Sequence, residues 1–170
     1  MSAWPTRIIP PPPPSWASWE AVMDAALAEA IQARDRGEVP VGALLLAGDG
    51  RLLARAGNEV EAGRDPTAHA EMLVLRRGAK RLGNHRLEGC ILAVTLEPCA
   101  MCAAALAQSR VAGLVYGAKD AGAGAVESCL DLLDQPFLKH RVWHLGGILQ
   151  EPCALALRQF FMGKREAEKI

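Results

Sequence analysis

The chain has 170 residues, of which 51% are apolar and 22% charged, a composition typical of one soluble, folded domain. Its 19 basic and 19 acidic residues cancel, which excludes a uniformly basic nucleic-acid-binding protein but allows a local basic face. Five cysteines, an odd number, argue against a disulfide framework.

The N-terminal segment, residues 1–17, contains five consecutive prolines at 10–14 and lacks the basic and apolar regions of a signal peptide. Because proline has no N–H and favours an extended path, this segment is predicted to be a disordered tail. Residues 18–166 are predicted to form the folded domain, and residues 167–170 a C-terminal tail. No apolar run reaches the ~20 residues of a membrane helix, so we expect a cytoplasmic protein without a membrane partner.

The first predicted elements are a helix and a hairpin. From Trp19 onward, apolar residues recur at helical spacing, Ser18 can cap the start and Gly37 can end the helix. This pattern predicts an amphipathic helix between these two residues. The next apolar runs, 41–47 and 51–56, flank a Gly-Asp-Gly sequence, which predicts a β-hairpin.

Predicted strands and helices then alternate to the end of the chain. In order, they are a helix over 68–82, a strand over 90–96, a helix over 99–109, a strand over 111–116, a short helix over 128–134, a weak strand over 141–145 and a closing helix over 151–164. A hairpin followed by this alternation predicts a three-layer α/β/α fold around a mixed five-stranded sheet.

Two short motifs at predicted helix starts can carry chemistry: His-Ala-Glu at 69–71 and Pro-Cys-Ala-Met-Cys at 98–102. Cysteines three residues apart share one face of a helix, and a helix N-terminus favours the thiolate. Cys99 and Cys102 can therefore bind one zinc ion, with His69 as the third ligand. Three protein ligands leave one tetrahedral position open, which is typical of catalytic zinc rather than structural zinc.

Glu71 distinguishes these two kinds of site. From the first turn of its helix it can reach over the open metal position and transfer protons, a role that a structural site does not need. Cys90 is the alternative, because a fourth sulfur ligand would close the site. Its place inside an apolar run favours burial in the core, and Cys129 and Cys153 are interpreted as core residues in the same way.

The combination of His-x-Glu and Pro-Cys-x-x-Cys is the signature of zinc-dependent nucleobase deaminases, and the order of elements fits a cytidine-deaminase-like fold. More narrowly, the chain from about residue 19 to 166 resembles the family of bacterial tRNA-specific adenosine deaminases. The segments that carry this resemblance are Glu-Val-Pro-Val-Gly-Ala at 38–43, Asp-Pro-Thr-Ala-His-Ala-Glu at 65–71, Thr-Leu-Glu-Pro-Cys-Ala-Met-Cys at 95–102, Ser-Arg-Val at 109–111, Tyr-Gly-Ala-Lys-Asp at 116–120, Phe-Phe at 160–161 and Lys-Arg at 164–165.

The resemblance implies conversion of adenosine to inosine at the wobble position of a tRNA anticodon stem-loop, by a homodimer with one zinc ion per subunit. Residues carried over by position are the zinc ligands His69, Cys99 and Cys102, the proton shuttle Glu71, Asn58 as a contact of the target nucleoside, and Val39 and Pro40 as lining of the base pocket. His85 departs from the family, which usually has an aromatic residue at this position.

Two other functions remain open from the residues. A deaminase of free cytosine, guanine or a nucleoside would carry the same motif, and a non-catalytic RNA-binding protein would use zinc only for stability. Residues 64–86 carry six Lys and Arg against two acidic residues, and the chain from 158 onward carries four against two. Such clusters can bind tRNA phosphates, although solvated helix faces have the same pattern. Phe160 and Phe161 fit either an RNA contact or core packing.

Overall fold

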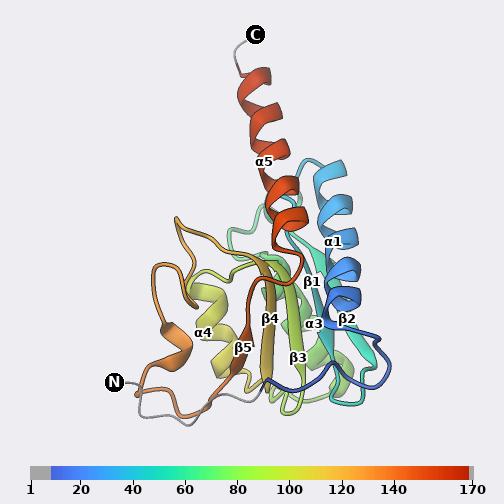
Figure 1. Cartoon of the computed structure of the whole chain (residues 1–170), viewed down its shortest axis with the longest axis vertical. Coiled ribbons are helices and arrows are strands. Elements are labelled where there is room, and N and C mark those ends of the chain that lie inside the picture. Colours follow the sequence, from blue (N-terminus) through green and yellow to red (C-terminus); the bar gives the residue numbers. More distant parts are fainter. Residues whose placement is uncertain (1–8, 169–170) are drawn as a thin grey trace.

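The computed structural model describes residues 9–168, so positions 1–8 of the predicted N-terminal tail (1–17) and positions 169–170 of the predicted C-terminal tail (167–170) lie outside the described residues. Its centre is a five-stranded sheet in the order β2-β1-β3-β4-β5 (Figure 1). The strands are β1 (Gly42–Leu46), β2 (Leu52–Gly57), β3 (Ile91–Leu96), β4 (Gly113–Ala118) and β5 (Trp143–Leu145). β1 runs antiparallel to β2 and β3, whereas β3, β4 and β5 are parallel. The predicted mixed sheet is confirmed.

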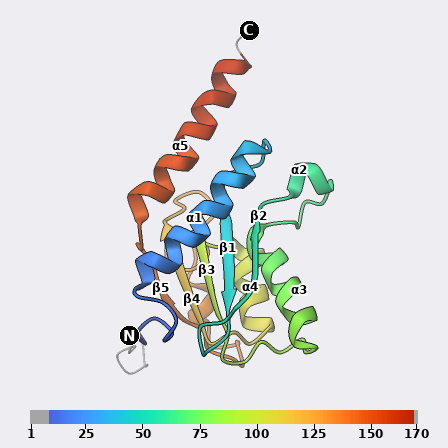
Figure 2. The same cartoon turned by 90° about the vertical axis from the view of Figure 1, so that its right-hand side faces the viewer.

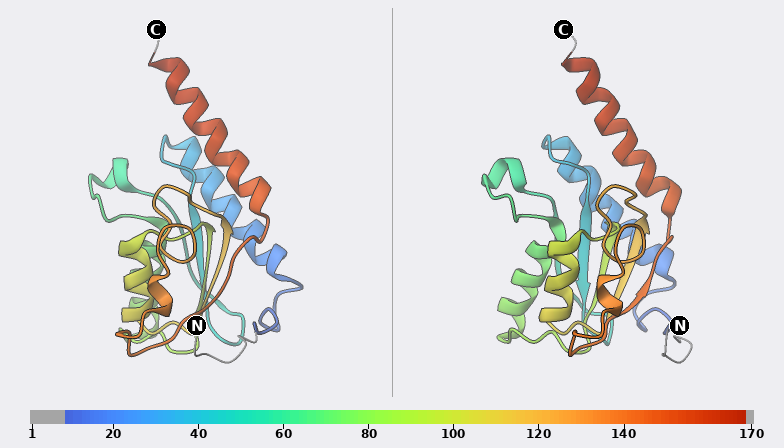
Figure 3. Two further views of the ribbon diagram at one scale, coloured as in Figure 1. Left: turned by 60° about the vertical axis from the view of Figure 1, so that its left-hand side comes forward. Right: turned by 90° about the vertical axis from the view of Figure 1, so that its left-hand side faces the viewer.

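Helices cover both faces of this sheet, which gives the predicted three layers (Figures 2 and 3). α1 (Trp19–Asp35) and α5 (Gln150–Ala167) lie on one face, and α3 (Ala70–Leu82) and α4 (Ala100–Gln108) lie on the other. No helix within residues 9–168 is both long and apolar enough to cross a membrane.

The predicted elements differ from the structure mainly in two loops. Residues 60–63 form a short helix, α2 (Val60–Gly63), where a loop is expected, and the predicted helix over 128–134 shrinks to a 3₁₀ turn, η1 (Leu132–Asp134). The amides of Cys129 and Leu130 both donate to the carbonyl of Gly124. These donors are therefore bound to an upstream turn instead of opening a helix, which is why the helix prediction is wrong there.

The core lies in two layers because β1 is buried on both faces. Ala43 and Leu45 belong to the cluster under α3 and α4, whereas Leu44 and Leu46 belong to the cluster under α1. All five residues of β1 are buried, as expected for a central strand covered on both sides.

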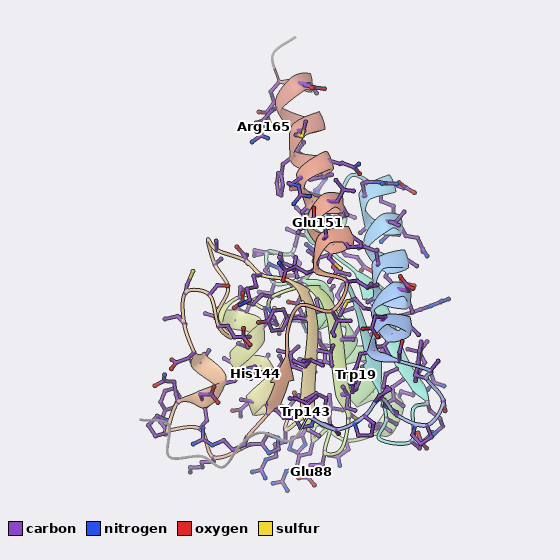
Figure 4. The ribbon with its side chains drawn as sticks, in the orientation of Figure 1. Trp19, Glu88, Trp143, His144, Glu151 and Arg165 are labelled. Carbon is purple, nitrogen blue, oxygen red and sulfur yellow. The ribbon has the colours of Figure 1, made fainter. Side chains whose placement is uncertain are left out.

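The described part of the predicted N-terminal tail, residues 9–17, contacts the folded domain. The Trp16 indole donates to the carbonyl of Gly50 at 3.0 Å, and the Ser15 hydroxyl donates to the carbonyl of Asp49 at 3.2 Å. Trp19 donates to the carbonyl of Pro10 and packs against Trp143 of β5, with 5.8 Å between ring centroids (Figure 4). The segment therefore lies against the β1–β2 turn.

Strand direction places the functional segments at one edge of the sheet, the upper edge in Figure 1. β3, β4 and β5 all end there, so the start of α4, the segment 119–128 and the start of α5 meet at this edge. Since β1 and β2 pair in antiparallel, the entry to β1 and the exit from β2 lie there too. The topology thus brings together segments as far apart in the chain as the entry to β1 at Gly42 and the start of α5 at Gln150.

Candidate metal and catalytic site

Three potential metal ligands meet at this edge. His69 is the N-cap residue of α3 and Cys99 that of α4, and Cys102 lies in the first turn of α4. The His69 Nδ1 atom is 3.7 Å from Cys99 Sγ and 3.6 Å from Cys102 Sγ, and all three ligand atoms lie within 4.8 Å of one another. Tetrahedral zinc with bonds of about 2.3 Å to sulfur and about 2.0 Å to nitrogen separates such atoms by about 3.6 Å. The donor set and its spacing therefore fit a zinc ion.

The electrostatics of the cluster favour a metal-binding thiolate. The pKa of Cys99 is lowered to about 3 by hydrogen bonds from the Cys102 thiol and from His69. The pKa of Cys102 is raised, because its thiol donates to Cys99 and is buried. The same contact with Cys99 raises the pKa of His69. The first thiolate, at Cys99, thus forms readily, whereas a second thiolate at Cys102 needs a bound cation to compensate its negative charge.

Glu71 lies beside this cluster in the first turn of α3 and is only 4% exposed. Burial raises its pKa to about 7, although His69 opposes this change. A buried carboxyl group that gains or loses a proton near neutral pH is suited to proton transfer.

Asn58 connects the exit of β2 to the start of α3. Its side-chain Oδ1 accepts a hydrogen bond of 2.9 Å from the buried N–H of Ala70, and its own N–H donates to the carbonyl of Val41 at 3.0 Å. The side chain therefore satisfies the first amide of α3, directly after His69. Because Oδ1 is used in this way, the amide nitrogen of Asn58 is the group that can meet a ligand.

Val39 and Pro40 lie in the connection from α1 to β1, at the same edge as Asn58. Val39 is half-buried and packs against the larger core cluster, and Pro40 is buried. The preceding residue, Glu38, is 1% exposed and accepts hydrogen bonds from the amides of Glu61 and Ala62 in α2. Glu38 thus joins this connection to the loop that leads from Asn58 to His69, a role that the sequence analysis missed.

The remaining cysteines do not join the metal cluster. Within residues 9–168, the cluster contains His69 and two cysteines, while Cys90 and Cys153 are buried in the core, as predicted. Cys129 is exposed, so its interpretation as a core residue is wrong. It lies on the turn held by Gly124 and not on a helix face directed at the core.

Three arginines of the predicted basic stretch bind their own chain. Arg77 pairs with Glu59 at 2.7 Å and donates to a carbonyl of β2, and Arg81 donates to two further carbonyls of that edge strand. Arg76 lies near Asp65. Arg77 and Arg81 therefore cover the edge of β2, and the charge of this stretch is partly structural.

The two phenylalanines lie on the part of α5 that projects beyond the sheet (Figure 1). Phe161 is 44% exposed and makes an edge contact with Phe160, over which the Lys164 ammonium lies 5.2 Å from the ring centroid. Arg165 lies further out on the same helix (Figure 4). Neither phenylalanine belongs to the two core clusters, so the structure contradicts the alternative that this pair packs in the core.

Comparisons with known proteins agree with this geometry. Residues 17–118 match the family described as the cytidine and deoxycytidylate deaminase zinc-binding region. The chain is 48% identical over 143 residues to a tRNA-specific adenosine deaminase of Agrobacterium fabrum, covering 84% of this chain and 93% of the relative. It is 43% identical over 150 residues to a protein of the same description from Bacillus subtilis, covering 88% and 92%.

Solved structures give the same fold. A structure from a study of A-to-I editing by tRNA:A34 deaminases superposes with a TM-score of 0.77 at 46% identity, covering 80% of this chain and 98% of the other. The guanine deaminase of Nitrosomonas europaea superposes with a TM-score of 0.74 at 26% identity, covering 85% of each chain. Both the narrower resemblance and the free-base alternative therefore have structural counterparts.

Proposed function

Because the chain belongs to the cytidine and deoxycytidylate deaminase zinc-binding family, we propose that it converts adenosine to inosine at the wobble position of tRNA anticodons. The observation that carries this choice is sequence identity over most of the chain. It is 46–48% to tRNA adenosine deaminases and 26% to the guanine deaminase of Nitrosomonas europaea. The predicted family and the cytidine-deaminase-like fold are thereby confirmed.

In this proposal, His69, Cys99 and Cys102 hold one zinc ion per subunit. The support is their N–S spacing, which matches tetrahedral zinc, and the lowered pKa of Cys99. Zinc in such a site supplies Lewis-acid activation of water at neutral pH. The start of α4 adds the partial positive charge of a helix N-terminus, which also favours thiolate ligands.

Glu71 carries the protons of the reaction. Its carboxylate takes a proton from the water that attacks C6 of the adenine ring, and it then delivers a proton to the exocyclic amine, which leaves as ammonia. Burial keeps its pKa near neutrality, so both protonation states are accessible during turnover. The amide nitrogen of Asn58 binds the target nucleoside, while Val39 and Pro40 form the wall of the base pocket.

The tRNA substrate needs contacts beyond the target base. The projecting part of α5 offers Phe161 for stacking and Lys164 and Arg165 for phosphates, at the end of the molecule where the metal cluster lies. We expect the enzyme to act in the cytoplasm, where tRNA is used.

The homodimer stays a prediction from the family. Its support here is a shallow, mostly apolar groove of about 290 Å³ on the outer face of α3 and α4, lined in part by Met72, Leu75 and Ala105. A second copy of the chain would cover these side chains. Sedimentation velocity of the purified protein measures the state directly, and a monomer at all micromolar concentrations would contradict the prediction.

The function is tested with a tRNA transcript that has adenosine at the wobble position. Free adenosine, cytosine and guanine are incubated in parallel, with inosine and ammonia as the readouts. Inosine at the wobble position is expected, and ammonia from a free base with unchanged tRNA would make the chain a small-molecule deaminase instead. Cys99→Ala and Cys102→Ala are expected to lose zinc in metal analysis, and full zinc occupancy would contradict the ligand assignment.

A further inference from the structure

Glu97 lies between the end of β3 and Cys99, and it is only 2% exposed. Its carboxylate accepts five hydrogen bonds from the segment 120–128. One oxygen accepts from the amides of residues 126, 127 and 128 at 3.1, 2.7 and 2.8 Å. The other accepts from the amide of Asp120 at 3.0 Å and from the Ser128 hydroxyl. A single side chain therefore determines the path of a nine-residue segment.

The segment that Glu97 holds lies directly against the loop that bears the metal ligands. The backbone of Gly124 forms a β-bridge with Cys99, and the amide of Ala125 donates to the carbonyl of Pro98 at 2.8 Å. A Cβ atom at Gly124 would be 2.5 Å from the Glu97 carboxylate, so only glycine fits at this position. The close packing joins the segment and the ligand loop into one unit.

All five partners of this buried carboxylate are N–H or O–H donors, so both of its oxygens act as acceptors within the protein. A carboxylate held in this way is a fixed anchor for the segment.

The same segment is also tied to the neighbouring strands. Glu127 lies 3.3 Å from the Lys119 ammonium at the end of β4 and 3.7 Å from Nε2 of His144 in β5 (Figure 4). Through the bridge between Gly124 and Cys99, residues 119–128 thus border the metal cluster on the side of β4 and β5.

We propose that Glu97 is a positioning residue for deamination, which acts by holding segment 120–128 as the fixed wall of the active site next to Cys99. This inference rests on the proposed function, because it assigns the wall to the substrate of the same site. The carboxylate itself does not touch the substrate, since its five acceptor interactions are made within the protein. A merely structural Glu97 would contribute to folding but not to turnover.

The test compares Glu97→Gln with Glu88→Gln, an equal change at an exposed glutamate at the opposite end of the molecule (Figure 4). Glutamine keeps the size of the side chain but turns one acceptor oxygen into a donor that faces N–H or O–H groups. Four quantities are measured for each variant: amide hydrogen exchange in peptides covering 119–128, zinc per chain, kcat and KM. The tRNA transcript and the free bases are all assayed, and kcat and KM are compared on the substrate that the wild type turns over.

We expect Glu97→Gln to speed exchange in 119–128 by about tenfold or more. We also expect it to lower kcat/KM by about tenfold to a hundredfold with zinc retained, because a displaced wall misplaces the substrate. Glu88→Gln should change none of these quantities. Unchanged exchange, loss of zinc, or faster exchange with wild-type kcat/KM would each overturn the proposal. If the wild type turns over a free base instead of tRNA, the proposed function is refuted. The role of Glu97 is still tested in that case, because the variants are then compared on that base.

A second variant keeps the test decisive if Glu97→Gln does not fold. Ser128→Ala removes one of the five donors from an exposed residue, so its fold should persist. Exchange in 119–128 should rise and kcat/KM should fall, both by less than for Glu97→Gln. If neither quantity changes in Ser128→Ala, the anchor does not act on turnover and the proposal fails.

Discussion

The interaction of Asn58 with α3 allows a structural and a binding role of one side chain to be separated. In Asn58→Ala, the N–H of Ala70 loses its side-chain acceptor, the Asn58 Oδ1 atom, while remaining fully buried. In Asn58→Asp, an oxygen stays at the same position and gains a negative charge at the N-terminus of a helix, which is favourable. Asn58→Asp keeps the acceptor of the Ala70 N–H and replaces with an oxygen the amide nitrogen that we assign to the substrate.

The size of the effect follows from the burial of the partner. A buried donor left without an acceptor costs about 1–3 kcal/mol. For a chain of this length, each kcal/mol lowers the unfolding temperature by about 2–4 °C. Asn58→Ala should therefore unfold about 2–12 °C below the wild type, whereas Asn58→Asp should unfold at or above the wild-type temperature.

Thermal unfolding of the zinc-loaded proteins and deamination of the tRNA transcript measure the two roles independently. Both variants should lose most of their activity, because neither has the amide nitrogen. If Asn58→Ala unfolds within about 1 °C of the wild type, a difference comparable to the error of the measurement, the capping role is refuted. Wild-type activity of Asn58→Asp would refute the substrate contact.

Three further predictions concern other parts of the chain. Glu71→Gln should retain zinc, and its rate of deamination in single-turnover experiments should fall by about 10²–10⁴-fold. A smaller loss than this would contradict its role as the proton carrier. Trp16→Ala should lower the free energy of unfolding in urea by about 1–2 kcal/mol through loss of its hydrogen bond and packing, whereas unchanged stability would mean that the N-terminal contacts contribute nothing. In the folded, zinc-loaded protein at pH 8, iodoacetamide should modify the exposed Cys129 before Cys90 and Cys153. Burial raises the pKa of Cys90, and it raises the pKa of Cys153 to about 11, so both residues have a lower thiolate fraction. Equal rates of modification of the three cysteines, measured by mass spectrometry, would contradict this burial.

The long elements of the fold could be predicted because their signals are local. Apolar spacing after Ser18 marks α1, and the side chain of Ser18 does accept from the amide of Ala21. The Gly-Asp-Gly turn marks the hairpin of β1 and β2. The short segments could not be predicted in the same way. Residues 128–134 have a helical pattern, but the amides of residues 128–130 bind Glu97 and Gly124 instead, and the spacing of apolar residues does not reveal such partners.

The residues of the candidate site also differ in how far the sequence alone predicts them. Cysteines at i and i+3 and a His-x-Glu pair identify the metal chemistry by spacing alone, because each pair lies within one helical turn. The sequence also distinguishes a site with a proton carrier from a purely structural site. It does not show that Asn58 caps α3 or that the carboxylates of Glu38 and Glu97 each hold a loop of the active-site edge.

Short-range patterns in the sequence thus predict the family, the order of the long elements, the two motifs of the metal-binding set and a candidate proton carrier, because each of these signals lies within one helical turn or one strand. The tertiary structure was needed to show that Asn58 caps α3, that Arg77 and Arg81 cover the edge of β2, and that Phe160 and Phe161 lie outside the core. The reason is that these polar contacts join groups 12 or more residues apart, which the packing of α3 against β2 brings together.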